Sequence, residues 1–187
     1  MKYFKLNMDM NESNNVVCHY ENDFGIPLDE FFVGRKNLNW DNCFYFFYDK
    51  NEGEILTDYL VNDKGWFVVS RKFKHLLEIM NTEIQFLPVK IIERKSGKEY
   101  TYYIANILRL VDALCLDNSE YFETEILGIG IIYTISKFAI YEKKVKNSDI
   151  FKLSNRQEIP IFVSEKFKKI IEKNRITGVS LREIVVV

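Results

Sequence analysis

The sequence contains few of the residues on which most catalytic and metal sites depend. Its 187 residues include two histidines, three cysteines, three prolines and eight glycines. Cys18, Cys43 and Cys115 are odd in number and far apart, which fits reduced thiols in a core rather than the disulfide framework of a small secreted protein. Cys18-His19 has no second group of ligands at zinc-like spacing. We therefore expect neither a metal centre nor a cofactor.

Long apolar runs are also absent. No stretch approaches the roughly 18 residues that a membrane span needs, and residues 1–5 lead into polar sequence instead of a signal-peptide core. The net charge is -1, so no overall attraction draws the chain to nucleic acid or to an anionic membrane. These absences predict a cytoplasmic protein that binds neither nucleic acid nor a membrane. They leave the oligomeric state open.

The residues that are present predict an ordinary globular chain. Hydrophobic residues make up 47% of the sequence, and the length falls within the usual size of one domain. We therefore expect residues 1–187 to form a single domain. Aromatic residues are crowded between Phe44 and Tyr48, where they fit a buried strand better than an exposed interface.

An internal repeat is the most informative feature of the sequence. Residues 69–78 align without gaps to residues 163–172, with six identities in ten positions. Such self-similarity indicates a supersecondary unit that is used twice. In each copy a β-branched or aromatic run precedes a serine, an amphipathic segment follows, and alternating apolar residues come last. We predict a strand, a helix and a strand at residues 66–89 and again at 160–184.

The serine in each copy has a structural explanation. Ser70 and Ser164 stand immediately before the helical pattern, where a serine oxygen accepts hydrogen bonds from unpaired amides of the first turn. We interpret both as helix caps, because neither has the flanking glycines of a catalytic nucleophile. Asn174, and Asn81 in the first copy, are expected to end the helices in the left-handed conformation.

The rest of the chain predicts further strands. Residues 86–93 and 99–106 flank a turn in which Gly97 would supply a positive φ, so they are expected to form a hairpin. Residues 2–6, 16–20 and 43–48 are candidate strands, and residues 107–116 show the apolar spacing of a short helix. Together these elements predict the α+β class, with a mixed sheet that contains the duplicated unit.

One group of charged side chains is a candidate site. From Leu110 to Ser136 the sequence contains no lysine or arginine, but it contains five acids: Asp112, Asp117, Glu120, Glu123 and Glu125. Converging carboxylates could bind a divalent metal or perform acid-base chemistry, although a solvated face is the more common explanation. A metal-dependent enzyme or a small-ligand-binding protein that uses residues 112–125 is therefore the alternative function.

Scattered positions resemble the eleventh family of immunity proteins from bacterial polymorphic-toxin systems. They are Asp58-Tyr59-Leu60 before residues 66–77, Asp112, Asp117 and Ser119 within residues 103–119, and Ile150-Phe151-Lys152-Leu153 before residues 161–179, which include Thr177-Gly178. The resemblance covers residues 58–185 and leaves out residues 1–57.

This resemblance implies a non-enzymatic cytoplasmic protein that binds a cognate toxin encoded nearby. It does not identify the toxin. We expect the five acids to contact a basic toxin surface, as they would if the toxin were a nuclease with a basic substrate cleft. The repeats would then form the scaffold, and the segments around them would recognise the toxin.

Overall fold

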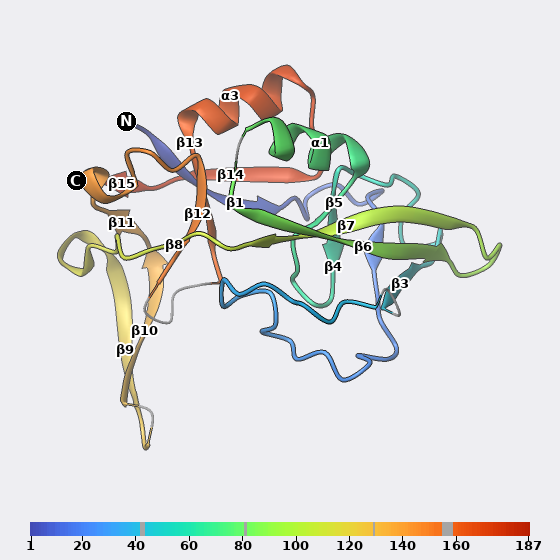
Figure 1. Cartoon of the computed structure of the whole chain (residues 1–187), viewed down its shortest axis with the longest axis horizontal. Helices are drawn as coiled ribbons and strands as arrows, with labels where there is room; N and C mark the ends of the chain where they lie inside the picture. The colour runs from blue at the N-terminus through green and yellow to red at the C-terminus, as the bar shows by residue number, and fades with distance from the viewer. Residues whose placement is uncertain (42–43, 81, 129, 155–158) are drawn as a thin grey trace.

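A computed structural model describes residues 1–41, 44–80, 82–128, 130–154 and 159–187. Its body consists of two β-sheets with two nine-residue helices, α1 (Arg71–Ile79) and α3 (Glu165–Lys173), side by side along one side of them, at the top of Figure 1. This arrangement confirms the α+β class. Among the described residues, no helix is long and apolar enough to cross a membrane.

The larger sheet has six strands, in the order β2, β4, β5, β7, β6 and β3. In that order they are Val17–Cys18, Tyr59–Asn62, Val68–Val69, Glu99–Ile107, Ile84–Glu93 and Tyr45–Tyr48. The long strands β6 and β7 form the predicted hairpin, and Gly97 in its turn has a φ of +71°. Phe44, Phe46 and Tyr48 are buried, so the aromatic run is a buried strand, as predicted.

The second sheet has five strands, in the order β14, β1, β13, β12 and β8. In that order they are Val179–Glu183, Tyr3–Met8, Ile161–Ser164, Ile150–Leu153 and Leu110–Val111. Strands β11 (Ala139–Ile140) and β15 (Val185–Val186) pair separately in parallel. The remaining elements are a 3-10 turn, η1 (Leu116–Asn118), the short helix α2 (Glu142–Val145), and β9 (Glu120–Ile126) with β10 (Gly130–Lys137).

The duplication extends beyond the predicted strand-helix-strand units. Strands β5 and β6 flank helix α1 in sequence but lie apart in the sheet, with β7 between them and antiparallel to both. Strands β13 and β14 flank α3, and β1 lies between them in the same way. An antiparallel partner, β4 or β12, precedes each unit. Each copy is therefore a split β-α-β unit completed by a strand from another part of the chain.

The two helices begin with the same set of hydrogen bonds. Ser70 Oγ accepts from Phe73 N–H and donates to Asp58 Oδ1 at 2.5 Å. Ser164 Oγ accepts from Phe167 N–H and donates to Asp149 Oδ1 at 2.7 Å. An aspartate that precedes each unit thus holds the capping serine in place.

The same aspartate in the first unit joins the two copies. Asp58 Oδ2 accepts hydrogen bonds from the backbone N–H and the hydroxyl of Thr177, at 3.1 and 3.2 Å. Tyr59 N–H in turn donates to the carbonyl of Thr177. Gly178 follows with a φ of +76° and no room for a side chain, because a Cβ there would meet Tyr59 O and Thr57. Two of the segments that carry the resemblance, Asp58-Tyr59 and Thr177-Gly178, therefore meet at one junction.

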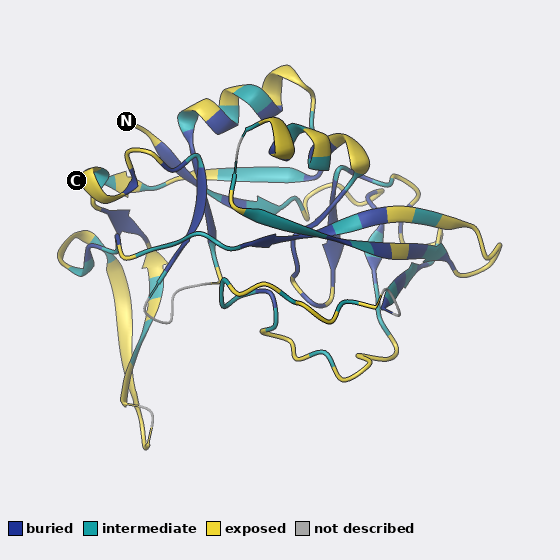
Figure 2. Ribbon diagram, in the orientation of Figure 1, coloured by how far each residue is buried: buried dark blue, intermediate teal, exposed yellow. Residues whose placement is uncertain are grey.

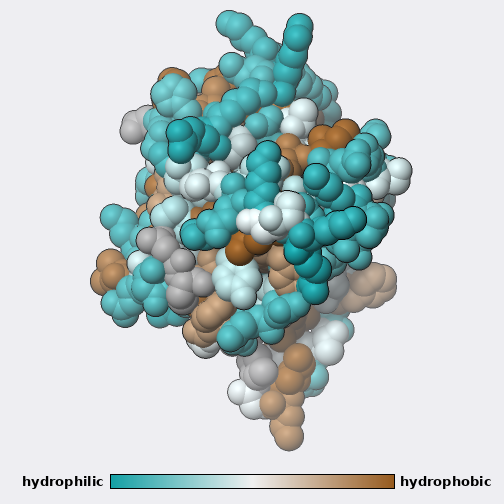
Figure 3. Space-filling view, turned by 90° about the vertical axis from the view of Figure 1, so that its right-hand side faces the viewer, coloured by the Kyte–Doolittle hydropathy of each residue, from teal (hydrophilic) through white to brown (hydrophobic). Residues whose placement is uncertain are grey.

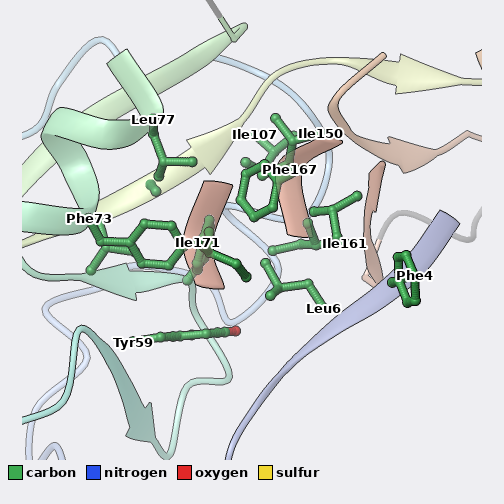
Figure 4. Packing of buried hydrophobic residues seen from close by; sticks show 14 residues of the cluster. Phe4, Leu6, Tyr59, Phe73, Leu77, Ile107, Ile150, Ile161, Phe167 and Ile171 are labelled. Carbon is green, nitrogen blue, oxygen red and sulfur yellow. The ribbon is translucent and has the colours of Figure 1, made fainter. Parts of the chain in front are cut away.

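Both helices cover a single core between the two sheets. Phe73 and Leu77 of α1 and Phe167 and Ile171 of α3 are buried in one cluster, in which the Phe73 and Phe167 rings lie 6.3 Å apart (Figure 4). A second cluster around Trp66 fills the opposite face of the six-stranded sheet. Apolar burial of this extent is the main source of stability.

Two local predictions are wrong. Residues 107–116 do not form a helix, because Ile107 ends the long strand β7 and Leu110–Val111 pair with β12 as β8. Asn174 has a φ of -88°, and the following Arg175 takes the left-handed conformation instead. Asn81 and Cys43 lie outside the described residues. Cys18 and Cys115 are buried free thiols.

Candidate partner-binding surface

A two-stranded hairpin projects from the body of the molecule. Strands β9 and β10 pair only with each other among the described residues, and we call residues 120–137 the arm. It extends away from both sheets (Figure 1), and all seven residues of β9 are exposed (Figure 2). An isolated hairpin is at best marginally stable in water. An arm of this kind therefore depends on its anchorage to the body.

Ser119 anchors the foot of the arm. Its hydroxyl donates to the carbonyl of Cys115 at 2.7 Å and accepts from the N–H of Ala139 at 3.0 Å, so it joins the two ends of the hairpin. Next to it, Lys137 Nζ lies 2.6 Å from Glu120 Oε1. This ion pair is exposed and stabilises by at most about 1 kcal/mol.

The pleat of the strands gives the arm two different faces. Successive side chains of a strand point to opposite sides, so Glu123 and Glu125 share one face with their cross-strand partners Tyr133 and Ile131. The ring of Tyr133 meets that of Tyr121 edge-on at a centroid distance of 5.3 Å. No ion pair joins Glu123 or Glu125 to any residue in the described part of the chain. This face therefore combines uncompensated negative charge with aromatic surface.

The other face and the tip of the arm carry large exposed apolar side chains. Phe122 and Ile126 lie on the second face, and the exposed fractions of Phe122 and Leu127 are 71% and 101%. The lowest part of the molecule in Figure 3, which is the tip of the arm, is accordingly brown. Grouped exposed apolar side chains indicate a surface that binds another molecule.

The structure brings some of the five predicted acids together and separates others. Glu120, Glu123 and Glu125 lie along β9. Asp117 lies in the turn η1, and Asp112 lies at the end of β8, where it pairs with Lys144 at 3.0 Å. In the described ranges, no three His, Cys, Asp or Glu side chains are grouped so as to hold a metal ion. Nothing in this geometry supports the alternative of a metal-dependent enzyme.

Comparison with known families decides which class of protein carries this surface. The immunity protein family Imm11 matches residues 2–186. The chain belongs to the Imm11 family of immunity proteins. The match includes residues 2–57, which the resemblance noted from the sequence left out. No curated protein sequence matches the chain.

Membership of Imm11 gives the chain the function of an immunity protein, which binds and neutralises a toxin. The partner is therefore a protein, and a large exposed surface is what such a partner requires. The apolar residues of the arm were not predicted as site residues. The available signal was the alternation of apolar and polar residues on both sides of Gly128 and Gly130. Alternation does not reveal that every residue of β9 is exposed.

The histidines lie away from the arm. His75 is on the solvated face of α1, as predicted, and its side chain is 74% exposed. His19 bridges Asp63 and Glu52, with Nδ1 and Nε2 each 2.8 Å from a carboxylate oxygen. Burial acts to lower the pKa of His19, but hydrogen bonds to the two carboxylates outweigh it and raise the pKa. This bridge joins two surface loops and has no direct contact with the arm.

Proposed function

We propose that this Imm11 protein neutralises its toxin with the arm, by contact alone and without catalysis, in the cytoplasm of the cell that makes both proteins. The observation that carries the proposal is the exposure of apolar side chains on an arm that pairs with no other strand in the described ranges. Burial of such side chains against a partner is favourable in the same way as burial in a core.

The acidic face of the arm defines the charge of the expected toxin surface. Glu123 and Glu125 have no cationic partner in the described structure, so a basic surface would compensate them. Opposite charges across an interface speed association and favour the correct partner. If the toxin is a nuclease, its basic cleft would match this face, and the arm would compete with nucleic acid. Asp117 at the foot would extend the same negative surface, whereas the charge of Asp112 is already paired with Lys144.

The first experiment identifies the toxin by growth rescue. Toxin genes that flank the gene for this chain would be expressed one at a time, with and without it. Restored growth and co-purification would identify the partner. If this chain rescues growth from none of the flanking toxins, the partner is not encoded by a neighbouring gene.

The second experiment tests the arm with that toxin. Reversal of Asp117, Glu120 and Glu123 to Lys should abolish binding while circular dichroism stays unchanged. The double reversal Glu123→Lys/Glu125→Lys is sharper, because it breaks no described ion pair. We expect it to weaken binding by about tenfold or more, chiefly through slower association.

A matched control changes the same charge at another place. Glu78→Lys/Glu172→Lys alters two exposed glutamates on α1 and α3. It breaks two i,i+4 pairs, worth roughly 0.3–0.5 kcal/mol each, and the 4.0 Å contact of Glu78 with the exposed His75. Toxin binding by this control should remain near the wild-type level. Unaltered binding by the Glu123/Glu125 variant would refute the role of the acidic face while leaving the immunity function intact.

A further inference from the structure

A small cavity at the foot of the arm has an excess of positive charge. It is lined by strands β1 and β14, by the foot of β10 and by Phe138, Ile184 and Val185, and its volume is about 230 Å³. Cavities that hold drug-sized molecules measure roughly 300–1,000 Å³, so this cavity suits a small group. We call it the Lys5–Arg182 cavity after the two of its three cationic residues that have no ion pair in the described chain; the third, Lys137, pairs with Glu120.

Lys5 and Arg182 are direct cross-strand neighbours in the antiparallel pair of β1 and β14. Like charges in this position destabilise a sheet. Neither side chain has an ion pair anywhere in the described part of the chain. The structure therefore keeps two cations side by side without a carboxylate between them.

The other charges around the cavity are already neutralised. Glu183 lies 2.9 Å from Lys2, and Lys137 pairs with Glu120. Lys5 Nζ lies 5.6 Å from the centroid of the Phe138 ring, a contact that compensates a desolvated cation only in part. Burial lowers the pKa of Lys5, and the nearby Arg182 lowers it further. The pair thus gains most from an anion placed between the two side chains.

We propose that the Lys5–Arg182 cavity binds an oxyanion, either a carboxylate or a phosphate group. Ammonium and guanidinium groups both form charge-assisted hydrogen bonds with such oxygens, and the amide of Asn7 lines the same cavity as a further donor. The anion can be free in solution or can belong to an acidic side chain of a bound protein. This site is distinct from the acidic face of the arm, which attracts the opposite charge.

Two neutral variants test the site. Lys5→Met and Arg182→Met each keep a long side chain and remove one cation, and Lys95→Met at the exposed β6–β7 turn is the matched control. Isothermal titration with inorganic phosphate should show binding by the wild type and the control. We expect each cavity variant to bind about tenfold more weakly, because one charge-assisted contact is lost.

Thermal unfolding in phosphate and in chloride of equal ionic strength provides the second readout. Phosphate stabilises proteins in general because it is excluded from their surface. The quantity to compare is therefore how much phosphate raises the Tm of the wild type and how much it raises the Tm of each variant. The increase in Tm in phosphate should be larger for the wild type than for either cavity variant. In chloride alone both variants should be at least as stable as the wild type, because the repulsion between the two cations is gone.

The outcomes separate the proposal from its alternatives. Equal phosphate affinity in the wild type and Arg182→Met would overturn it, as would an Arg182→Met variant less stable than the wild type in chloride, which indicates a structural role. Arg182 is exposed, so its variant tests the site even if Lys5→Met fails to fold. Titration with N-acetyl-glutamate amide distinguishes the sources: binding supports a protein carboxylate as the occupant, and binding of phosphate alone supports a free anion.

Discussion

The two aspartates that precede the repeated units should contribute unequally to stability. Asp58 accepts hydrogen bonds from Ser70 Oγ, from Lys72 Nζ, and from the N–H and hydroxyl of Thr177. For Asp149 the structure gives two donors, the hydroxyl of the capping serine and an exposed lysine. The Asp58 side chain is 12% exposed and that of Asp149 is 24% exposed. The first carboxylate therefore has more partners and less access to water.

The magnitudes follow from these contacts. A hydrogen bond to a buried charged group contributes roughly 1.5–3 kcal/mol, whereas an exposed lysine pair contributes about 0–1 kcal/mol. We expect Asp149→Ala to lower the free energy of unfolding by about 2 kcal/mol. Asp58→Ala should lower it by about 3–4 kcal/mol, because it also leaves the Thr177 amide without its acceptor. In a protein of this size the second loss corresponds to a decrease of about 6–16 °C in Tm.

Urea denaturation of the two variants and the wild type measures both values, provided that the slope of the transition is unchanged. Thr177→Val, alone and combined with Asp58→Ala, completes a double-mutant cycle, in which the double variant should lose less stability than the two single variants together. If Asp149→Ala destabilises as much as Asp58→Ala, the junction between the two units does not contribute as described.

Two further perturbations test other parts of the structure. The raised pKa of His19 means that the charged imidazole stabilises the folded protein; this contribution is complete below the ordinary pKa of 6.5 and is lost as pH rises through the folded-state pKa. The difference in urea midpoint between the wild type and His19→Gln should therefore decrease as pH rises. A difference that stays constant with pH would contradict the bridge. Gly178→Ala should destabilise the protein by about 2–3 kcal/mol or more, whereas Gly97→Ala should cost about 1–2 kcal/mol. Both glycines have a positive φ, but only Gly178 is packed against Tyr59 and Thr57. If calorimetry shows that the two variants lower Tm equally, the close packing at Gly178 is refuted.

The repeated units could be predicted from the sequence because their signals are local. The serine at the start, the apolar stripe and the alternating strand all lie within about 25 residues, and each structural preference acts on near neighbours. The aspartate that supports each serine was missed as part of the repeat. It lies 12 residues before Ser70 and 15 before Ser164, so an alignment without gaps cannot place both.

The wrong helix at residues 107–116 has a different origin. Its apolar residues do follow the helical period, yet Ile107 is buried in the core beneath α1 and α3, whereas Ala113 is buried in a separate cluster around Phe162. Burial in two different clusters needs an extended chain that passes between them. Local periodicity gives no information about such distant partners.

In the arm, too, the local sequence could not predict the whole candidate site. The acids of β9 were predicted as site residues from their charge. Which cross-strand neighbours they have, however, depends on the register between β9 and β10, which the charge pattern does not give. The exposed apolar side chains that accompany them could not be recognised, because an apolar residue in a strand is usually buried. Only the three-dimensional arrangement shows that the whole of β9 is exposed.

The position of β1 has a consequence for how the protein is made. Strand β1 lies between β13 and β14, from which about 150 residues of chain separate it. At a synthesis rate of roughly 5–20 residues per second, the ribosome delivers its partners about 8–30 s after β1 itself. During that interval β1 has unpaired edges that other chains can bind. The second sheet thus closes only after Glu183 has emerged, and the first sheet can assemble well before it.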